Sequence, residues 1–422
     1  MAMNGAYLIR IVSILAMSLF AGFIQVMVSI AAKVSDASIF GVISIDDDRK
    51  RILSEYMLFL FRSQLIDVSL SCIVAFSVAF ICMKLMLPVA ARFGLIDHPD
   101  GERKVHENST PIIGGVGMLV GVTVSMLFSR SVSQQQGIYV AMVLMAFTGV
   151  MDDRMNVSFK VRFILQALAT LCMIYYSGVV LDSFGDLLGS GLISTGMYSW
   201  VVTIFCVCGV INAINMMDGL DGLAGSLSLV AFISFGLLAS ISGRGDLLFL
   251  ITAFSGAVAA FLYFNWHPAR LFMGDGGSMA IGFVLAYLSL AITQQGSGVS
   301  PVAALMVLSL PVSDTVAVML GRISTGKNPF KPDRSHLHHL LLGLGLSQKG
   351  VVGIMVALTA ASSSAAIAAT LYRVPDRVLF ALWCTGFVSY MLVRSKTGAL
   401  HRVVQRLQNR PSVSGKLDAI NR

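Results

Sequence analysis

Six aspartates of this chain lie at or near the ends of long apolar segments. They are Asp152, Asp153, Asp218, Asp221, Asp275 and Asp314. Ionisable side chains at membrane depth are costly and usually mark a functional site. Carboxylate oxygens are the ligands that Mg2+ prefers, and neighbouring glycines let backbone N–H groups approach a phosphate. The residue types therefore predict a site for a divalent cation and a phosphate-bearing ligand.

Five of these aspartates fall in three short motifs, which are MDDR at 151–154, NMMDGLDGLAG at 215–225 and FMGDGGS at 272–278. Adjacent carboxylates such as Asp152 and Asp153 repel each other unless a cation or a proton lies with them. In a helix, Asp218 and Asp221 would share one face with Asn215, but the intervening glycines favour a helix break that lines a cavity. One motif alone is compatible with a solvated helix end. Three together predict a shared site.

Two further segments contribute basic groups. The segment HPDGERKVHENSTPIIGG at 98–115 places Arg103 and Lys104 before a predicted helix start at Pro111, and free N–H groups at a helix N-terminus bind phosphate. A capped helix beside a basic membrane anchor is the equally weighted alternative. The segment GRISTGKNPFKPDRSHLHHLLLGLG at 321–345 contains Arg334, His336, His338 and His339. It predicts a cationic pocket for a diphosphate, in preference to a zinc site, because no cysteine or HExxH partner is near.

The composition indicates an all-α, polytopic integral membrane protein. Of 422 residues, 56% are hydrophobic and only 12% are charged, and the mean hydropathy is +0.81, far from the values of a soluble domain. We predict 11 or 12 transmembrane helices around a cytoplasm-facing active-site cleft, from apolar runs of spanning length. These runs lie at 11–32, 66–88, 112–129, 138–151, 161–181, 198–216, 223–241, 247–264, 276–293, 299–320, 350–371 and 375–393.

The distribution of lysine and arginine orients these segments. If 66–88 ends in the cytoplasm, the cytoplasmic connections and the tail hold 19 basic residues, and the opposite connections beyond residue 90 hold four. Basic residues gather on the cytoplasmic side, so the aspartate motifs are predicted to lie at that face. The net charge of +8 is then explained by loops next to anionic lipid, and no nucleic-acid partner is predicted.

We expect three parts along the chain. Residues 1–65 form an extra N-terminal transmembrane segment and loop, 66–393 form the membrane domain, and 394–422 form a basic cytoplasmic tail. A cleaved signal peptide is the alternative for 11–32, but that apolar run is long for one.

In order along the chain, RKVHENSTPIIGG, FTGVMDDRMNVSFKVRFILQ, INAINMMDGLDGLAG, FMGDGGS and NPFKPDRSHLHH resemble the motifs of the polyprenyl-phosphate N-acetylhexosamine-1-phosphate transferases, within glycosyltransferase family 4. The likeness covers about residues 66–349. Its PDR-S-HLHH wording is closest to the branch that primes O antigen and enterobacterial common antigen.

The resemblance implies transfer of N-acetylhexosamine-1-phosphate, with GlcNAc-1-phosphate favoured, from a UDP-sugar to undecaprenyl phosphate with release of UMP. It places the enzyme in the bacterial inner membrane, in the lipid bilayer, and leaves monomer and homodimer both open. It implies Mg2+, with Mn2+ as the alternative. Matching positions make Asp152, Asp153, Asp218 and Asp221 catalytic. They make Asn215, Asp218 and Asp275 metal-binding, and Arg103, Lys104, Arg334, His336, His338 and His339 substrate-binding.

Several alternatives stay open at this point. Where many primer enzymes of this branch carry a third aspartate after DDR, this chain has Asn156. UDP-FucNAc and UDP-QuiNAc are alternative donors, and a two-step route through an aspartyl-phosphate is chemically feasible. A cation-coupled transporter is the alternative from another class, but it predicts midplane charges and a repeat relating two halves, and the sequence shows neither. An inactive scaffold would be expected to show decayed motifs.

Overall fold

The structure is a computed structural model that describes residues 47–97, 109–128, 132–155, 157–294, 296, 298–328 and 335–408. Its contacts divide the chain into two compact units, Met1–Leu70 and Ser71–Arg422. The first unit contributes the start of helix α2 (Asp47–Met86). The predicted helix at 11–32 lies outside the described residues, as do Arg103, Lys104, Asn156 and Arg334.

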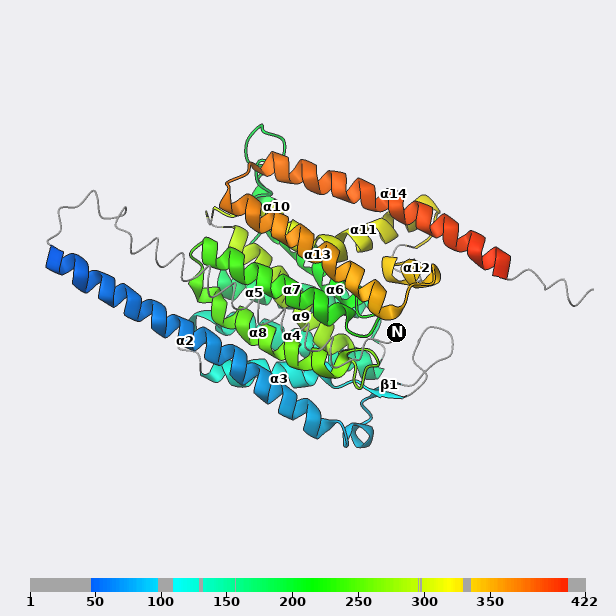
Figure 1. Cartoon of the computed structure of the whole chain (residues 1–422), viewed down its shortest axis with the longest axis horizontal. Coiled ribbons are helices and arrows are strands. Elements are labelled where there is room, and N and C mark those ends of the chain that lie inside the picture. Colours follow the sequence, from blue (N-terminus) through cyan, green and yellow to red (C-terminus); the bar gives the residue numbers. More distant parts are fainter. Residues whose placement is uncertain are drawn as a thin grey trace, which may run out of the picture. The chain divides into compact units, whose positions relative to one another are not determined.

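Helix α9 (Gly274–Thr293) forms the centre of the second unit (Figure 1). It is apolar on nearly every face, which is the pattern of a helix surrounded by protein. Of its apolar stretch, 94% is buried. Its packing neighbours include α3 (Gly114–Leu127), α4 (Val132–Met155), α6 (Ser199–Met216), α7 (Leu223–Ile241) and α10 (Pro301–Val307).

The remaining helices cover this core. Helix α8 packs between α3 and α7, α5 packs on α4 and α6, and α13 packs on α7 and α10. Their bounds are α5 (Phe159–Ser177), α8 (Leu248–Asn265), α11 (Ser309–Ser324), α12 (Leu337–Gly343), α13 (Gln348–Leu371) and α14 (Asp376–Gln408). Short 3-10 helices are η1 (Ala90–Phe93), η2 (Gly196–Tyr198) and η3 (Gly245–Leu247).

Eight of the described helices are long and apolar enough to span a membrane, and the pair α10 and α11, bent by 82°, would make a ninth. The prediction of an all-α polytopic membrane protein is therefore confirmed, although the described spans are fewer than 11 or 12. Two predicted spans account for most of the difference. Helix α3 has 14 residues and so reaches only about 21 Å, whereas α4 ends in the charged MDDR motif and is not among the eight.

One predicted helix start is wrong. The spanning parts of α2 (Leu65–Met86) and α14 (Asp376–Lys396) agree with the predicted spans, and the two helices extend further, to Asp47 and to Gln408. Helix α3 begins at Gly114 and not at Pro111. The reason is a strand: β1 (Ile96–Asp97) pairs antiparallel with β2 (Thr110–Pro111), and the Phe272 N–H donates to the Pro111 carbonyl at 2.8 Å.

Helices α4 and α9 touch through glycine. A Cβ built on Gly149 would lie 2.3 Å from the Cα of Gly276, so a larger residue at Gly149 would push the helices apart. This close approach sets the C-terminal end of α4, which carries Asp152 and Asp153, directly against the N-terminal turn of α9, which carries Asp275.

Candidate active site

The three aspartate motifs meet at one end of the helical core. MDDR ends α4, NMMDGLDGLAG joins α6 to α7, and FMGDGGS begins α9. Helix α6 ends at Met216 and α7 begins at Leu223, so the predicted helix break around Asp218 and Asp221 is confirmed. We call Asp152, Asp153, Asp218 and Asp275 the carboxylate cluster.

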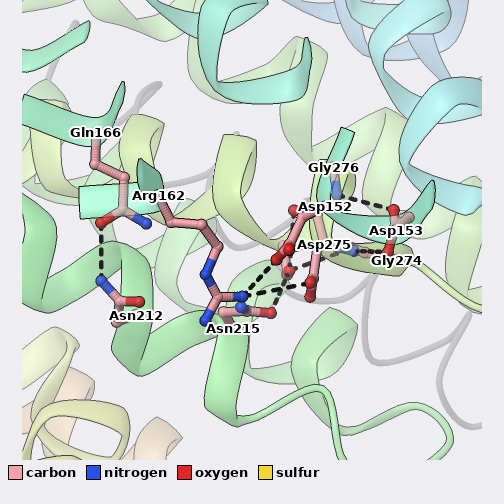
Figure 2. A network of polar contacts seen from close by, with 10 residues as sticks. Asp152, Asp153, Arg162, Gln166, Asn212, Asn215, Gly274, Asp275 and Gly276 are labelled. Carbon is pink, nitrogen blue, oxygen red and sulfur yellow. Dashed lines mark hydrogen bonds and ion pairs between the residues drawn. The ribbon is translucent and has the colours of Figure 1, made fainter. Parts of the chain in front are cut away.

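Arg162, near the start of α5, joins two members of the carboxylate cluster (Figure 2). Its Nη1 lies 2.5 Å from Oδ2 of Asp152 and 3.6 Å from Oδ2 of Asp275. Asp152 is buried, whereas Asp275 keeps a third of its side chain exposed. A single guanidinium therefore pairs with two carboxyl groups, which favours their ionised forms.

Asp153 caps helix α9 from outside that helix. Its Oδ1 accepts the N–H of Asp275 at 2.9 Å, and its Oδ2 accepts the N–H of Gly276 at 3.4 Å. Gly274 has a φ of +75°, which favours glycine, and a Cβ there would lie 2.7 Å from Asp153 Oδ2. A carboxylate at a helix N-terminus is stabilised by the free N–H groups and the helix dipole. The adjacent aspartates thus have different partners.

Asn215 and Asp218 bring the α6 end into the same site. The Ser278 hydroxyl of α9 donates to Oδ1 of Asn215 at 2.8 Å. Burial, followed by the nearby Asp153 and Asp221 carboxylates, raises the pKa of Asp218 to about 7. The raised pKa means that the ionised form of Asp218 is disfavoured in these surroundings. A bound cation would stabilise that form.

Asp221 points to a different set of partners. Its Oδ2 is hydrogen-bonded to Nδ1 of His267 at 2.8 Å and accepts the N–H of Ala269 at 3.1 Å. Next to it, the Gly222 N–H donates to the Asn265 side chain at 2.8 Å. These bonds hold the α6–α7 connection to the α8–α9 connection. A catalytic role for Asp221 stays a prediction, and its contacts are those of a residue that fixes the loop.

Three histidines at the start of α12 lie in contact with one another, and we call them the histidine cluster: His336, His338 and His339. The rings of His336 and His338 are 5.8 Å apart at 11°, and those of His338 and His339 are 4.2 Å apart. His336 and His338 are buried. A Cβ on Gly219 would lie 2.6 Å from Nε2 of His338, so the histidine cluster lies directly against the residue that follows Asp218.

The predicted cationic pocket for a diphosphate stays a prediction, and the charge of His338 without a ligand bears on it. Burial, followed by the neighbouring His339, lowers the pKa of His338 to about 3, so this ring is neutral at pH 7. The side chain is 1% exposed, and its Nδ1 has no hydrogen-bond partner within the described part of the chain. His338 can still donate to or accept from a ligand, but without charge.

The donor set fits Mg2+ even though it forms no closed cage. Among the described residues, no three His, Cys, Asp or Glu side chains have the spacing of a metal site. Mg2+ usually takes only one or two protein carboxylates and completes its shell with water and substrate phosphates. Asp275, Asp218 and Asn215 would provide oxygen ligands of this kind. The raised pKa of Asp218 reflects burial and then the repulsion between neighbouring carboxylates, which the ion would reduce.

Several residues of the site had no role in the sequence interpretation. They are Arg162, Gln166, Asn212, His267, Ser278 and Tyr390. Gln166 lies one turn after Arg162 on α5, and its Oε1 accepts from Asn212 of α6 at 2.9 Å (Figure 2). The four-residue spacing in RFILQ was the available signal, because it puts both polar side chains on one helix face.

Comparison with known proteins places these features in context. Residues 136–293 match glycosyl transferase family 4. The chain is 33% identical to an undecaprenyl-phosphate alpha-N-acetylglucosaminyl 1-phosphate transferase of Yersinia pestis, over 79% of this chain and 93% of the relative. It is 31% identical to the Escherichia coli (strain K12) protein of the same name, over 76% and 89%. The Pasteurella multocida protein of that name is 32% identical, over 81% and 97%.

Proposed function

Because this chain belongs to glycosyl transferase family 4, we propose that it transfers GlcNAc-1-phosphate from UDP-GlcNAc to undecaprenyl phosphate and releases UMP. The product would prime a cell-surface polysaccharide such as O antigen. The observation that carries the proposal is the meeting of the carboxylate cluster, Arg162 and the histidine cluster at one end of the helical core. Similar full-length relatives bearing that activity in their names support it.

The reaction needs two phosphorylated substrates side by side. A phosphate oxygen of undecaprenyl phosphate attacks the sugar-bearing phosphorus of the UDP-sugar, and the bond to the bridging oxygen breaks as UMP leaves. The nucleophile is already an anion, with a second pKa of about 6, so a strong base is not required. Catalysis then depends on positioning and on stabilising charge.

The two clusters suit the two substrates. Asp153, fixed at the first turn of α9, is assigned to the lipid-phosphate half and orients that group. The histidine cluster is assigned to the nucleotide half, with Arg334 and with Arg103 and Lys104 supplying positive charge. Asp275, Asp218 and Asn215 would hold Mg2+, which supplies charge neutralisation at the diphosphate when bound. Arg162 bridges Asp152 and Asp275 through one guanidinium nitrogen and so holds both carboxyl groups in place.

We assign the activity to residues 66–393 of an inner-membrane protein whose active end faces the cytoplasm, where UDP-sugars are found. The basic residues of the predicted cytoplasmic connections support this orientation. A cysteine at Ser335, in a variant without the native cysteines, should react with an impermeant thiol reagent only after the cytoplasmic face is opened. A cysteine at Ser242, beyond the opposite end of α7, should react from outside. Labelling of both from one side would contradict the orientation.

The deciding experiment is an assay of detergent-purified protein with undecaprenyl phosphate, Mg2+ and a panel of UDP-N-acetylhexosamines. We expect UMP release with UDP-GlcNAc, dependent on both the lipid and Mg2+. Release with UDP-FucNAc or UDP-QuiNAc alone would keep the reaction and change the sugar. An absence of UMP release with every donor, from protein that elutes as a folded species, would contradict the proposed function.

A further inference from the structure

The Asp314 carboxylate, in α11, is fully buried and accepts three hydrogen bonds. Its Oδ2 accepts from Nδ1 of His336 at 2.7 Å. Its Oδ1 accepts the Leu337 N–H at 3.1 Å and the Tyr390 hydroxyl at 2.6 Å. The three donors come from the start of α12 and from α14, so one carboxylate holds the histidine segment between two helices. A buried carboxylate is tolerated only when hydrogen-bond donors surround its oxygens in this way.

These hydrogen bonds determine which ring nitrogen of His336 carries a hydrogen. An ionised carboxylate only accepts hydrogen bonds, so Nδ1 of His336 must carry a hydrogen and donate it. Nε2 is then the nitrogen left for other partners. Carboxylate–imidazole pairs set the tautomer and the ring orientation of functional histidines in this way.

The orientation of the His336 ring also constrains the His338 ring, because the two rings are stacked. They lie nearly parallel, and His338 lies against Gly219, next to Asp218. A continuous set of contacts therefore runs from Tyr390 on α14 to the carboxylate cluster. The family match at 136–293 includes neither Asp314 nor Tyr390.

We propose that Asp314 and Tyr390 are positioning residues for the nucleotide half of the site. They hold His336, and through it the histidine cluster, in the orientation that binds the diphosphate of the UDP-sugar. This inference rests on the proposed function. Neither residue touches the substrate, and both act through His336.

The first measurement tests the positioning by itself. Diethyl pyrocarbonate modifies accessible imidazoles, and the rate at each histidine can be followed by mass spectrometry. In the wild type we expect His336 to react slowly compared with His267, whose side chain is 40% exposed. Asp314→Asn and the milder Tyr390→Phe should raise the His336 rate and leave the His267 rate unchanged. An unchanged His336 rate in both variants would overturn the positioning.

The second measurement tests the link to nucleotide binding. Tyr390→Phe and Asp314→Asn should raise the KM for UDP-GlcNAc, by about tenfold or more for Asp314→Asn, and change kcat at saturating donor much less. In a His336→Gln background, Tyr390→Phe should have no further effect, because the two side chains act through one contact. A fall in kcat alone, or full additivity, would overturn the role. Tyr263→Phe and Asp246→Asn are matched controls away from the site.

The two measurements separate this inference from the proposed function. If the wild type releases no UMP from any donor while the His336 rate still rises in the variants, the proposed function fails and the positioning stands. If the wild type is active and the variants keep its KM for UDP-GlcNAc, the inference fails and the proposed function stands.

Discussion

The carboxylate cluster and the histidine cluster lie next to each other but differ in how their charges are compensated. In the carboxylate cluster, Arg162 serves two aspartates, and Asp218 has its pKa raised to about 7 by burial and by its acidic neighbours. In the histidine cluster, Asp314 is paired with His336 and His338 is neutral. The first region brings four carboxyl groups around one guanidinium, which fits the proposed binding of Mg2+ and a phosphate-bearing substrate. The second is internally balanced and provides a fixed shape.

The comparison predicts the largest effect at Asp275. Asp275→Asn removes a charged oxygen ligand while its backbone N–H continues to bind Asp153. We expect UMP release at ordinary Mg2+ to fall by about a hundredfold or more, with little change in the amount of folded protein in the membrane. The assay is UMP release across a Mg2+ titration, with Asp246→Asn as the control. Full activity with an unchanged Mg2+ requirement would remove Asp275 from the ion site.

Next in size is the effect of Arg162 on stability. Arg162→Leu leaves Asp152 and Asp275 uncompensated, so without Mg2+ the protein should lose about 1.5 to 3 kcal/mol of stability. Mg2+ should then raise the melting temperature more in the variant than in the wild type, because it replaces the missing positive charge. Thermal melts in detergent, with EDTA or Mg2+, measure both. Lys160→Leu removes the same charge from an exposed neighbour and should show neither change.

The third prediction is that the carboxylate cluster acts on turnover and the histidine cluster acts on nucleotide binding. Asp153→Asn should lower kcat by about tenfold to a hundredfold through loss of positioning, while the Kd for UDP-GlcNAc, measured by direct titration, stays nearly constant. His338→Ala should do the reverse and weaken nucleotide binding by about tenfold or less, the value of a neutral hydrogen bond. Equal weakening of nucleotide binding by both variants would place Asp153 in the nucleotide half.

The last prediction concerns the pH dependence of stability. Burial lowers the pKa of His338 from 6.5 to about 3, so below pH 6.5 the unfolded chain binds a proton that the folded chain does not. The stability contributed by the neutral ring is present above that pH and is lost as the pH falls. Between pH 7 and pH 5 the wild type should lose about 2 kcal/mol more than His338→Gln. Parallel melting curves at the two pH values would contradict the neutral, buried state.

The sequence predicted the meeting of the aspartate motifs because alternating spans and basic loops place them at the same end. It could not predict which nearby basic residue contacts the aspartates, since Arg154, Lys160 and Arg162 all lie within ten positions of Asp152. The position of Arg162 on α5 places it against Asp152 and Asp275. The bonds from Asp314 to His336 and Tyr390 cross 22 and 76 residues, without any local pattern. The start of α3 was misplaced because residue 111 pairs with a distant segment.

The bond between Tyr390 and Asp314 also concerns the order in which the protein is made. Helix α14 is the last described helix of the chain, so during synthesis Tyr390 is added after every aspartate motif. Until then one oxygen of Asp314 lacks its hydroxyl partner. On the proposed function, the hydrogen-bond set that positions the nucleotide half of the site is therefore complete only once α14 is present.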